Sequence, residues 1–317
     1  MRLLVLGAGG IGGYFGGRLA EGGADVTFLV RSTRREQLQR DGLRIESPLG
    51  DVHLQPQTVV AGELAPGYVL VLFTCKAYDL DSAIDAIAPT VRGACAVVPM
   101  LNGFSHLDRL EERFGAAHVM GGTCQINVML GRDGVIRHGD PLQRLIFGER
   151  DGSTSARAQA LADELAKTKI DWTLSGNIEQ DMWEKIVFLA ALAATTCLFR
   201  GNVGEIASAP GGPEAMERAL AANAEIATRE GHPPRPGLID SARRRLTDRS
   251  GTWSASMLRD LEGGGAVEGD HIIGWMLDKA RKHRVDDAIL SLAYTHVKAY
   301  EARRRARRLP ASGGTSA

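Results

Sequence analysis

The sequence has no excess of charge of either sign, and this absence excludes several classes of protein. Its 317 residues include 38 lysines and arginines and 38 aspartates and glutamates, so the formal net charge is zero. A protein that mainly holds nucleic acid phosphates carries a basic surface and a positive balance. The remaining composition, 44% hydrophobic and 24% charged residues, is ordinary for a globular protein. We therefore expect a soluble protein with a small-molecule partner and no nucleic acid partner.

Cysteines and long hydrophobic runs are also scarce. The longest apolar stretch, residues 186–199, contains two threonines and falls short of the roughly 20 residues that a membrane span needs. It is better explained as a buried helix, and the opening apolar run is too short for a signal peptide. We expect a cytoplasmic protein with no membrane partner. Cysteines that are scattered, without a CxxC pair or a nearby histidine, predict small buried hydrophobes and no metal site; they are Cys75, Cys95, Cys124 and Cys197.

Glycine, in contrast, is abundant, with 38 residues against the roughly 22 that an average content of about 7% would give. Many of these glycines lie in the first loop. Residues 3–6 form an apolar run, residues 7–13 a glycine-rich turn and residues 14–20 a helical pattern, and residues 25–30 form a second apolar run. This order predicts a strand–helix–strand unit and hence a parallel sheet.

The rest of the chain falls into a mixed half and a helical half. Strands are predicted at residues 68–74, 94–100 and 118–125, with helices at 79–88 and 105–114 between them. Short runs at residues 128–130, 135–138 and 143–148 indicate an antiparallel extension, which a helix at 156–168 and a strand at 170–174 follow. Beyond Asn177 the sequence is helix-forming to about Arg308, with breaks at glycine and proline.

These patterns predict an α/β protein with a Rossmann-type, doubly wound parallel sheet followed by an all-helical domain. We place a nucleotide-binding domain at residues 1–174 and a helical substrate domain at residues 175–308. Residues 309–317 are small and polar, which predicts a disordered tail.

The first loop meets the G-x-G-x-x-G spacing with Gly7, Gly9 and Gly12, and Gly10 and Ile11 stand inside it. It follows an apolar strand and opens a helix, which is the context that dinucleotide binding requires. The first glycine permits a tight turn, the second lets the backbone approach a pyrophosphate, and the third lets the helix pack on the sheet. The helix start offers free N–H groups to the anion. The alternative is a glycine-rich turn that binds no ligand.

The end of the second strand favours NADP over NAD. An NAD enzyme usually carries a carboxylate there for the ribose 2′-hydroxyl, whereas this chain has Arg31. A guanidinium suits a 2′-phosphate, and no carboxylate follows the strand to repel it. Arg34 and Arg35 are interpreted as solvated charges on a helix.

A lysine opens the apolar helix of the second half. Lys185, Leu189 and Ala193 fall four residues apart on one helix face, after a capping-box pattern of Asn177 and Gln180. Such a lysine either extends its ammonium group from the edge of the apolar face to solvent or takes part in catalysis. The pattern alone favours the first interpretation.

Several motifs together resemble the ketopantoate reductase family, the 2-dehydropantoate 2-reductases, which are NADPH enzymes of pantothenate synthesis. The resemblance covers the chain from residue 1 to about 300 and implies a Rossmann domain followed by an all-helical one. It rests on motifs that occur in the family's order: the glycine loop, Thr74-Cys75-Lys76, Leu101-Asn102-Gly103, Trp183-Glu184-Lys185, the segment 256–260, and the segment 268–274.

The resemblance implies specific roles. It makes Lys185 the general acid and Glu268 its partner, a residue that also lies at the cofactor. It matches Ser256 to the serine that binds the substrate carboxylate, Asn102 to the asparagine beside nicotinamide and substrate, and Lys76 to a lysine near the nicotinamide ribose. Each has a simpler alternative: a strand-end charge for Lys76, a turn residue for Asn102, a helix-start hydroxyl for Ser256 and a solvated carboxylate for Glu268.

The chain departs from the family pattern beside the lysine. Members that reduce ketopantoate usually carry asparagine one and two turns after the catalytic lysine, where this chain has Leu189 and Ala193. We therefore expect NADPH-dependent reduction of a 2-oxo acid to a 2-hydroxy acid, ketopantoate by resemblance. The alternatives are a more hydrophobic keto acid or ketone, and a protein that senses NADPH without turnover. A homodimer is possible, and the basic residues 303–308 are interpreted as a solvated helix end that complements the helix dipole.

Overall fold

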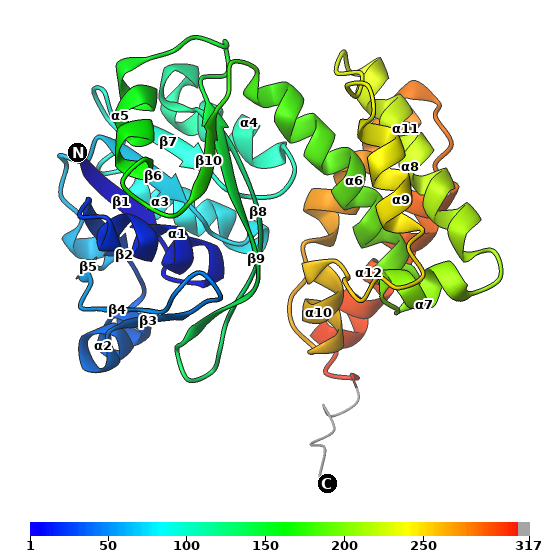
Figure 1. Cartoon of the computed structure of the whole chain (residues 1–317), viewed down its shortest axis with the longest axis horizontal. Helices are drawn as coiled ribbons and strands as arrows, with labels where there is room; N and C mark the ends of the chain where they lie inside the picture. The colour runs from blue at the N-terminus through cyan, green and yellow to red at the C-terminus, as the bar shows by residue number, and fades with distance from the viewer. Residues whose placement is uncertain (310–317) are drawn as a thin grey trace, which may run out of the picture. The chain divides into compact units, whose positions relative to one another are not determined.

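The computed structural model describes residues 1–309 and contains two compact units, one of residues 1–182 and one that begins at Trp183 (Figure 1). The division falls inside a helix, eight residues after Leu174, where the sequence placed the domain boundary. Residues 310–317, most of the predicted disordered tail, lie outside the described residues.

The first unit is built on a parallel sheet of five strands in the order β5-β2-β1-β6-β7 (Figure 1). Each neighbouring pair in this order is parallel, as the strand–helix–strand pattern predicts. The strands are β1 (Arg2–Leu6), β2 (Asp25–Leu29), β5 (Gln57–Val59), β6 (Leu70–Phe73) and β7 (Ala96–Pro99).

Both faces of this sheet are buried, which explains why its strands are continuous apolar runs rather than alternating ones. Along β1, Leu3 and Val5 belong to one core while Leu4 and Leu6 belong to the other. The helices that accompany the sheet are α1 (Gly10–Glu21), α2 (Ser32–Asp41), α3 (Leu80–Ile87) and α4 (Ser105–Phe114), with short helical turns η1 (Ala61–Glu63), η2 (Ala77–Asp79) and η3 (Ala116–His118). The predicted doubly covered parallel sheet is therefore confirmed.

A second sheet in the same unit was predicted only in part. It runs β10-β9-β3-β4, with β8 paired to β9. The predicted antiparallel extension is present, but it consists of two long strands rather than three short runs. The strands β3 and β4, and β5 of the first sheet, were missed because each is short and mixes polar with apolar residues, so none forms a continuous apolar run. The second sheet contains β3 (Leu43–Glu46), β4 (Val52–Leu54), β8 (Gly121–Leu130), β9 (Ile136–Gly148) and β10 (Asp171–Leu174), and α5 (Ala156–Leu165) precedes β10.

The second unit is helical throughout its described residues, as predicted from the loss of strand patterns after Asn177. The break at residues 263–265 ends one helix, because Gly264 has φ of +72° and the N–H of Gly265 donates to Asp260 O at 2.8 Å. Tyr300 then donates its hydroxyl to Gly265 O at 2.7 Å. The helices are α6 (Ile178–Phe199), which begins before the division, α7 (Val203–Ser208), α8 (Gly212–Arg229), α9 (Leu238–Leu246), α10 (Ser256–Glu262), the π-helical turn η4 (Asp270–Gly274), α11 (Trp275–His283) and α12 (Ala288–Arg305).

The apolar helix α6 is longer than the sequence indicated. It has 22 residues and is long and apolar enough by composition to cross a membrane, whereas the apolar run at residues 186–199 covers only part of it. Of the residues in its most apolar stretch, 72% are buried inside the protein, which identifies α6 as a core helix. Gln180 N–H donates to Asn177 Oδ1 at 3.3 Å, which confirms one half of the predicted capping box.

Three of the four cysteines are buried, as predicted, whereas Cys75 is partly exposed. Burial raises the pKa of the Cys95 thiol to about 11 and that of Cys197 to about 12, so both remain protonated near neutral pH. Among residues 1–309, no group of three or more histidine, cysteine, aspartate or glutamate side chains could hold a metal ion. The basic residues 303–308 are all exposed.

Candidate functional site

Four of the predicted site segments follow four adjacent strands of the parallel sheet. The glycine loop follows β1, Arg31 follows β2, Lys76 follows β6, and Asn102 follows β7. Because the strands are parallel, these loops share the carboxyl edge of the sheet. The chain passes from β1 to β2 on one side and later returns to β6 on the other side of β1. Such a switch point is where ligands bind in open α/β sheets.

The glycine loop has the backbone that its motif predicts. Gly7 has φ of +91°, a region that favours glycine, and its N–H donates to Leu29 O at 2.9 Å. At Gly12 an added Cβ would lie 2.2 Å from Thr74 Oγ1 and 2.3 Å from Gly7 O, so only glycine fits. Thr74 donates the same hydroxyl to Leu6 O at 2.6 Å, which joins the end of β1 to the end of β6.

Gly9 differs from Gly12 because the protein itself leaves its Cβ position empty. A Cβ added there would meet no protein atom within 4 Å, and its φ of −83° is open to any residue. Gly9 is the N-cap of α1, so no side chain at this position accepts a hydrogen bond from the first N–H groups of the helix. The first turn of α1 also contains no acidic residue. An uncapped helix start beside an open backbone fits the pyrophosphate of a dinucleotide. The residues present therefore fit a dinucleotide cofactor.

Arg31 meets a carboxylate that the sequence did not indicate. Its Nη2 donates to Asp79 Oδ1 at 2.9 Å, from the N-cap of α2 to the end of η2. The Arg31 side chain is 79% exposed and the Asp79 side chain 35% exposed. No local pattern could reveal this pair, because 48 residues separate its members.

The prediction that Arg34 is a solvated charge was wrong. It lies on a helix, as expected, but it is only partly exposed and its Nε donates to Ala8 O, inside the glycine loop, at 3.1 Å. Its Nη1 donates to Gln37 Oε1 at 2.6 Å and to Gly134 O at 3.2 Å. Partial burial lowers the pKa of its guanidinium. Arg35 is also partly exposed, with 30% of its side chain accessible, but it pairs with Glu63.

Lys76 and Asn102 occupy the loops that the motifs predict. Lys76 is the N-cap of η2 and is partly exposed. Asn102 is also partly exposed, and the Gly103 that follows it has φ of +80°. Asn102 therefore lies in a turn, which agrees with the simpler alternative and is compatible with a role at the sheet edge.

The other three predicted site residues belong to the helical unit. Lys185 lies in the second turn of α6 and is partly exposed, and Leu189 one turn later is also partly exposed. Ala193, another turn along, is 0% exposed. Leu189 is therefore accessible at this helix face, whereas Ala193 is part of the core of its unit.

Glu268 and Ser256 lie on either side of the glycine break that follows α10. Glu268 is only 8% exposed, so the alternative of a solvated carboxylate is excluded. It lies two residues before η4, and π-helical turns of this kind occur often at functional sites. A Cβ at Gly269 would lie 2.4 Å from Val297 Cγ1, which fixes this segment closely against α12. Ser256 is the first residue of α10 and is partly exposed.

An ion pair beside Lys185 was not predicted. Glu184 is 8% exposed and accepts three hydrogen bonds from Arg235: from Nε at 2.7 Å, from Nη2 at 2.6 Å and from the backbone N–H at 2.9 Å. This bidentate geometry fixes the α8–α9 loop to α6. The ring of Trp183 stacks on His232 of the same loop, with centroids 5.4 Å apart. Together these contacts hold the turn of α6 that carries Lys185.

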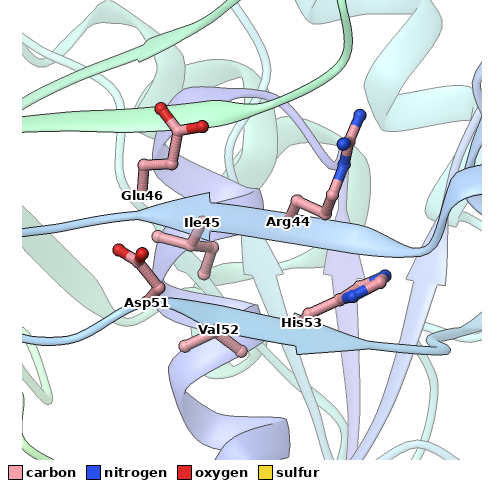
Figure 2. Close-up of a pocket in the computed structure, with 6 residues that line it drawn as sticks. All are labelled: Arg44, Ile45, Glu46, Asp51, Val52 and His53. Carbon is pink, nitrogen blue, oxygen red and sulfur yellow. The ribbon is translucent and has the colours of Figure 1, made fainter.

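A pocket of about 300 Å³ lies elsewhere in the first unit. It is lined by residues of β3 and β4, which are paired, and by the residue that precedes β4; Figure 2 shows their side chains. None of the predicted site residues contributes to it. Its lining residues are Arg44, Ile45, Glu46, Asp51, Val52 and His53.

Comparison with known proteins agrees with this arrangement over most of the chain. Residues 3–152 match the model of the ketopantoate reductase PanE/ApbA family, and residues 177–301 match that of its C-terminal domain. The chain belongs to the ketopantoate reductase family. It is an oxidoreductase family, and the predicted fold, a parallel-sheet domain with a helical domain after it, is that of its solved members.

Individual relatives cover nearly the whole chain. The uncharacterized oxidoreductase YkpB of Bacillus subtilis strain 168 is 38% identical over 302 residues, or 95% of this chain and 99% of that protein. The crystal structure of 2-dehydropantoate 2-reductase from Methylococcus capsulatus is 27% identical, with a TM-score of 0.85 over 96% of this chain and 98% of that one. The structure of a D-mandelate dehydrogenase with NADH and anilino(oxo)acetate is 20% identical, with a TM-score of 0.86 over 96% and 99%, and shows a shared fold.

Proposed function

We propose that this protein is an NADPH-dependent reductase that converts a 2-oxo acid to the corresponding 2-hydroxy acid. The observation that carries the proposal is the carboxyl edge of the parallel sheet, where an open glycine loop, Arg31, Lys76 and Asn102 follow adjacent strands. Membership of the ketopantoate reductase family supports it, and ketopantoate is the substrate that the family implies.

The first unit would hold the dinucleotide through its own backbone and cations. The N–H groups at the start of α1 and the open side of Gly9 suit the pyrophosphate. Arg31 suits a 2′-phosphate, while Lys76 and Asn102 suit the nicotinamide end. Bound NADPH would supply the hydride that reduces the ketone carbon.

The second unit would supply the proton. As the ketone carbon is reduced, its oxygen gains negative charge, and an ammonium group at that oxygen stabilises the charge and donates a proton. We assign this role to Lys185. Glu268 is buried and can orient the lysine, and Ser256 can donate a hydrogen bond to the substrate carboxylate. The Glu184–Arg235 contact would keep the lysine-bearing turn in place.

A second candidate substrate is a bulkier or more hydrophobic 2-oxo acid. Leu189 is partly exposed one turn after Lys185, where an apolar side chain replaces a hydrogen-bonding asparagine. A site that lacks such a partner discriminates less well in favour of a substrate hydroxyl. The shared fold of the D-mandelate dehydrogenase with anilino(oxo)acetate supports an apolar 2-oxo acid as an alternative.

A panel of 2-oxo acids tests the proposal. It would include ketopantoate, branched aliphatic acids and aromatic acids, each followed by NADPH and by NADH consumption. We expect steady-state turnover with at least one of them, and Lys282→Met, which removes a lysine of the same unit outside the proposed site, should leave turnover intact. Dinucleotide binding without turnover of any acid would contradict a reductase and favour a sensor.

A further inference from the structure

The Arg31–Asp79 ion pair spans the carboxyl end of β1. Arg31 follows β2 and Asp79 follows β6, and these two strands flank β1 in the sheet. The glycine loop continues from β1. The pair therefore connects the two loops on either side of the loop that would hold the dinucleotide.

The carboxylate of Asp79 offsets the attraction of Arg31 for a 2′-phosphate. A lone guanidinium at the end of β2 would attract a doubly charged 2′-phosphate, but here the carboxylate of Asp79 lies 2.9 Å from its Nη2. A phosphate that bonds to Arg31 must compete with this carboxylate and is repelled by it. A ribose 2′-hydroxyl meets no such repulsion and can donate a hydrogen bond to a carboxylate, which is how acidic residues favour NAD.

The side chain of Asp79 has no local structural task that would explain its position. Asp79 is the N-cap of α3, yet its carboxylate makes no capping hydrogen bond. Ser82 bonds to the backbone oxygen of Asp79 rather than to its side chain. An exposed ion pair of this kind contributes little to stability.

We propose that Asp79 is a specificity-determining residue that lowers the preference of this protein for NADPH over NADH. The inference rests on the proposed function, because it concerns the dinucleotide of the same site. Arg31 favours the 2′-phosphate, Asp79 opposes it, and the two effects partly cancel. The wild-type protein accordingly binds both dinucleotides.

Dissociation constants for NADPH and NADH, measured by titration calorimetry on the full chain, test this role without relying on turnover. We define the preference for NADPH as the dissociation constant for NADH divided by that for NADPH. Asp79→Asn removes the carboxylate charge and retains the size of the side chain, and it should raise this ratio by about tenfold. Arg31→Gln should lower the same ratio. Asp81→Asn is the matched control, because Asp81 lies two residues away on α3 and pairs with Arg109 at 2.9 Å.

The outcomes of these titrations distinguish failure of the role of Asp79 from failure of the proposed function. A tenfold rise for Asp79→Asn with no change for Asp81→Asn supports the role of Asp79. An unchanged ratio for Asp79→Asn, or an equal change for both variants, overturns it while dinucleotide binding stands. If the wild-type protein binds neither dinucleotide, the proposed function itself fails, and this inference fails with it.

Discussion

The Nε of Arg34 donates to the backbone oxygen of Ala8, 3.1 Å away, and so joins α2 to the glycine loop. The same guanidinium bonds to Gly134 O in the turn between β8 and β9. A further nitrogen, Nη2, is buried without a hydrogen-bond partner, which is costly for a cationic group. Arg34 thus stabilises the loop from the side of the second sheet.

Replacing Arg34 with methionine tests this contact. The variant removes donors from two backbone oxygens, so we expect a loss of about 1–3 kcal/mol in the free energy of unfolding and weaker dinucleotide binding. Chemical denaturation and calorimetry measure both effects. Arg35→Met is the matched control, since Arg35 pairs with Glu63 at the surface and should cost about 0–1 kcal/mol. Equal losses in the two variants would show that the buried contacts of Arg34 do not stabilise the loop.

Two glycines of the same loop should respond in opposite ways to alanine. Gly9→Ala places a methyl group in space that the protein leaves empty, so stability should change by less than about 1 kcal/mol while dinucleotide affinity falls at least tenfold. Gly12→Ala would place a methyl group 2.2 Å from Thr74 Oγ1 and should lower stability by about 1–3 kcal/mol or more. Thermal unfolding and dinucleotide titration distinguish them. Unimpaired binding by Gly9→Ala would argue against a pyrophosphate at this loop.

The sequence predicted the fold well wherever one local pattern decides the structure. The run at residues 3–6, the glycine turn and the next strand form one continuous unit, and the loss of strands after Asn177 marks the helical half. The patterns failed for β3, β4 and β5, because these short strands mix polar with apolar residues and form no continuous apolar run. They also misjudged α6, because its helix extends beyond its most apolar stretch.

The candidate site was predictable in its loops but not in its long-range pairs. The G-x-G-x-x-G spacing predicted the glycine loop, and the resemblance to the ketopantoate reductase family indicated the segments around Lys76, Asn102 and Lys185. Neither could reveal that Asp79 pairs with Arg31, or that Arg34 contacts the glycine loop, because these contacts depend on how distant strand ends meet. The burial of Glu268 likewise depends on the close packing of its segment against α12.

Leu189 should influence which 2-oxo acid is reduced. Leu189→Asn restores a hydrogen-bonding side chain at a partly exposed position, so we expect the ratio of kcat/KM for ketopantoate to that for an apolar 2-oxo acid to rise about tenfold or more. Ala193→Asn should instead lower the free energy of unfolding, because Ala193 is 0% exposed and the larger, polar amide would have to be buried in the core. Steady-state kinetics on the folded variant provide the measurement. A ratio that Leu189→Asn leaves unchanged would remove Leu189 from the substrate site.

Stability at acid pH should depend on Glu230. Burial raises the pKa of this carboxyl, but hydrogen bonds from Lys279, Lys282 and His283 outweigh burial and lower it from 4.5 to about 2. A carboxyl with a depressed folded pKa stabilises the protein above its unfolded pKa and loses that contribution as the pH falls. Part of the unfolding free energy should therefore disappear between about pH 4.5 and pH 2.

Glu230→Gln tests this network by denaturation at a series of pH values. We expect the variant to be less stable near neutral pH and to lose less stability across the same acid range. Glu225 lies on α8, the helix whose C-cap is Glu230, and its exposed carboxylate pairs with Arg229. Glu225→Gln should therefore follow the wild-type curve closely. The assignment fails if Glu230→Gln retains the full acid-dependent loss.

The most direct test of the proposed reaction follows the hydride itself. With NADPH that carries deuterium at the transferred C4 position and the best 2-oxo acid of the panel, mass spectrometry should find the 2-hydroxy acid heavier by one mass unit, labelled at C2. Lys185→Met should slow its formation by about a hundredfold or more while the dissociation constant for NADPH changes little. Unlabelled product, or near wild-type turnover by Lys185→Met, would contradict hydride transfer assisted by this lysine.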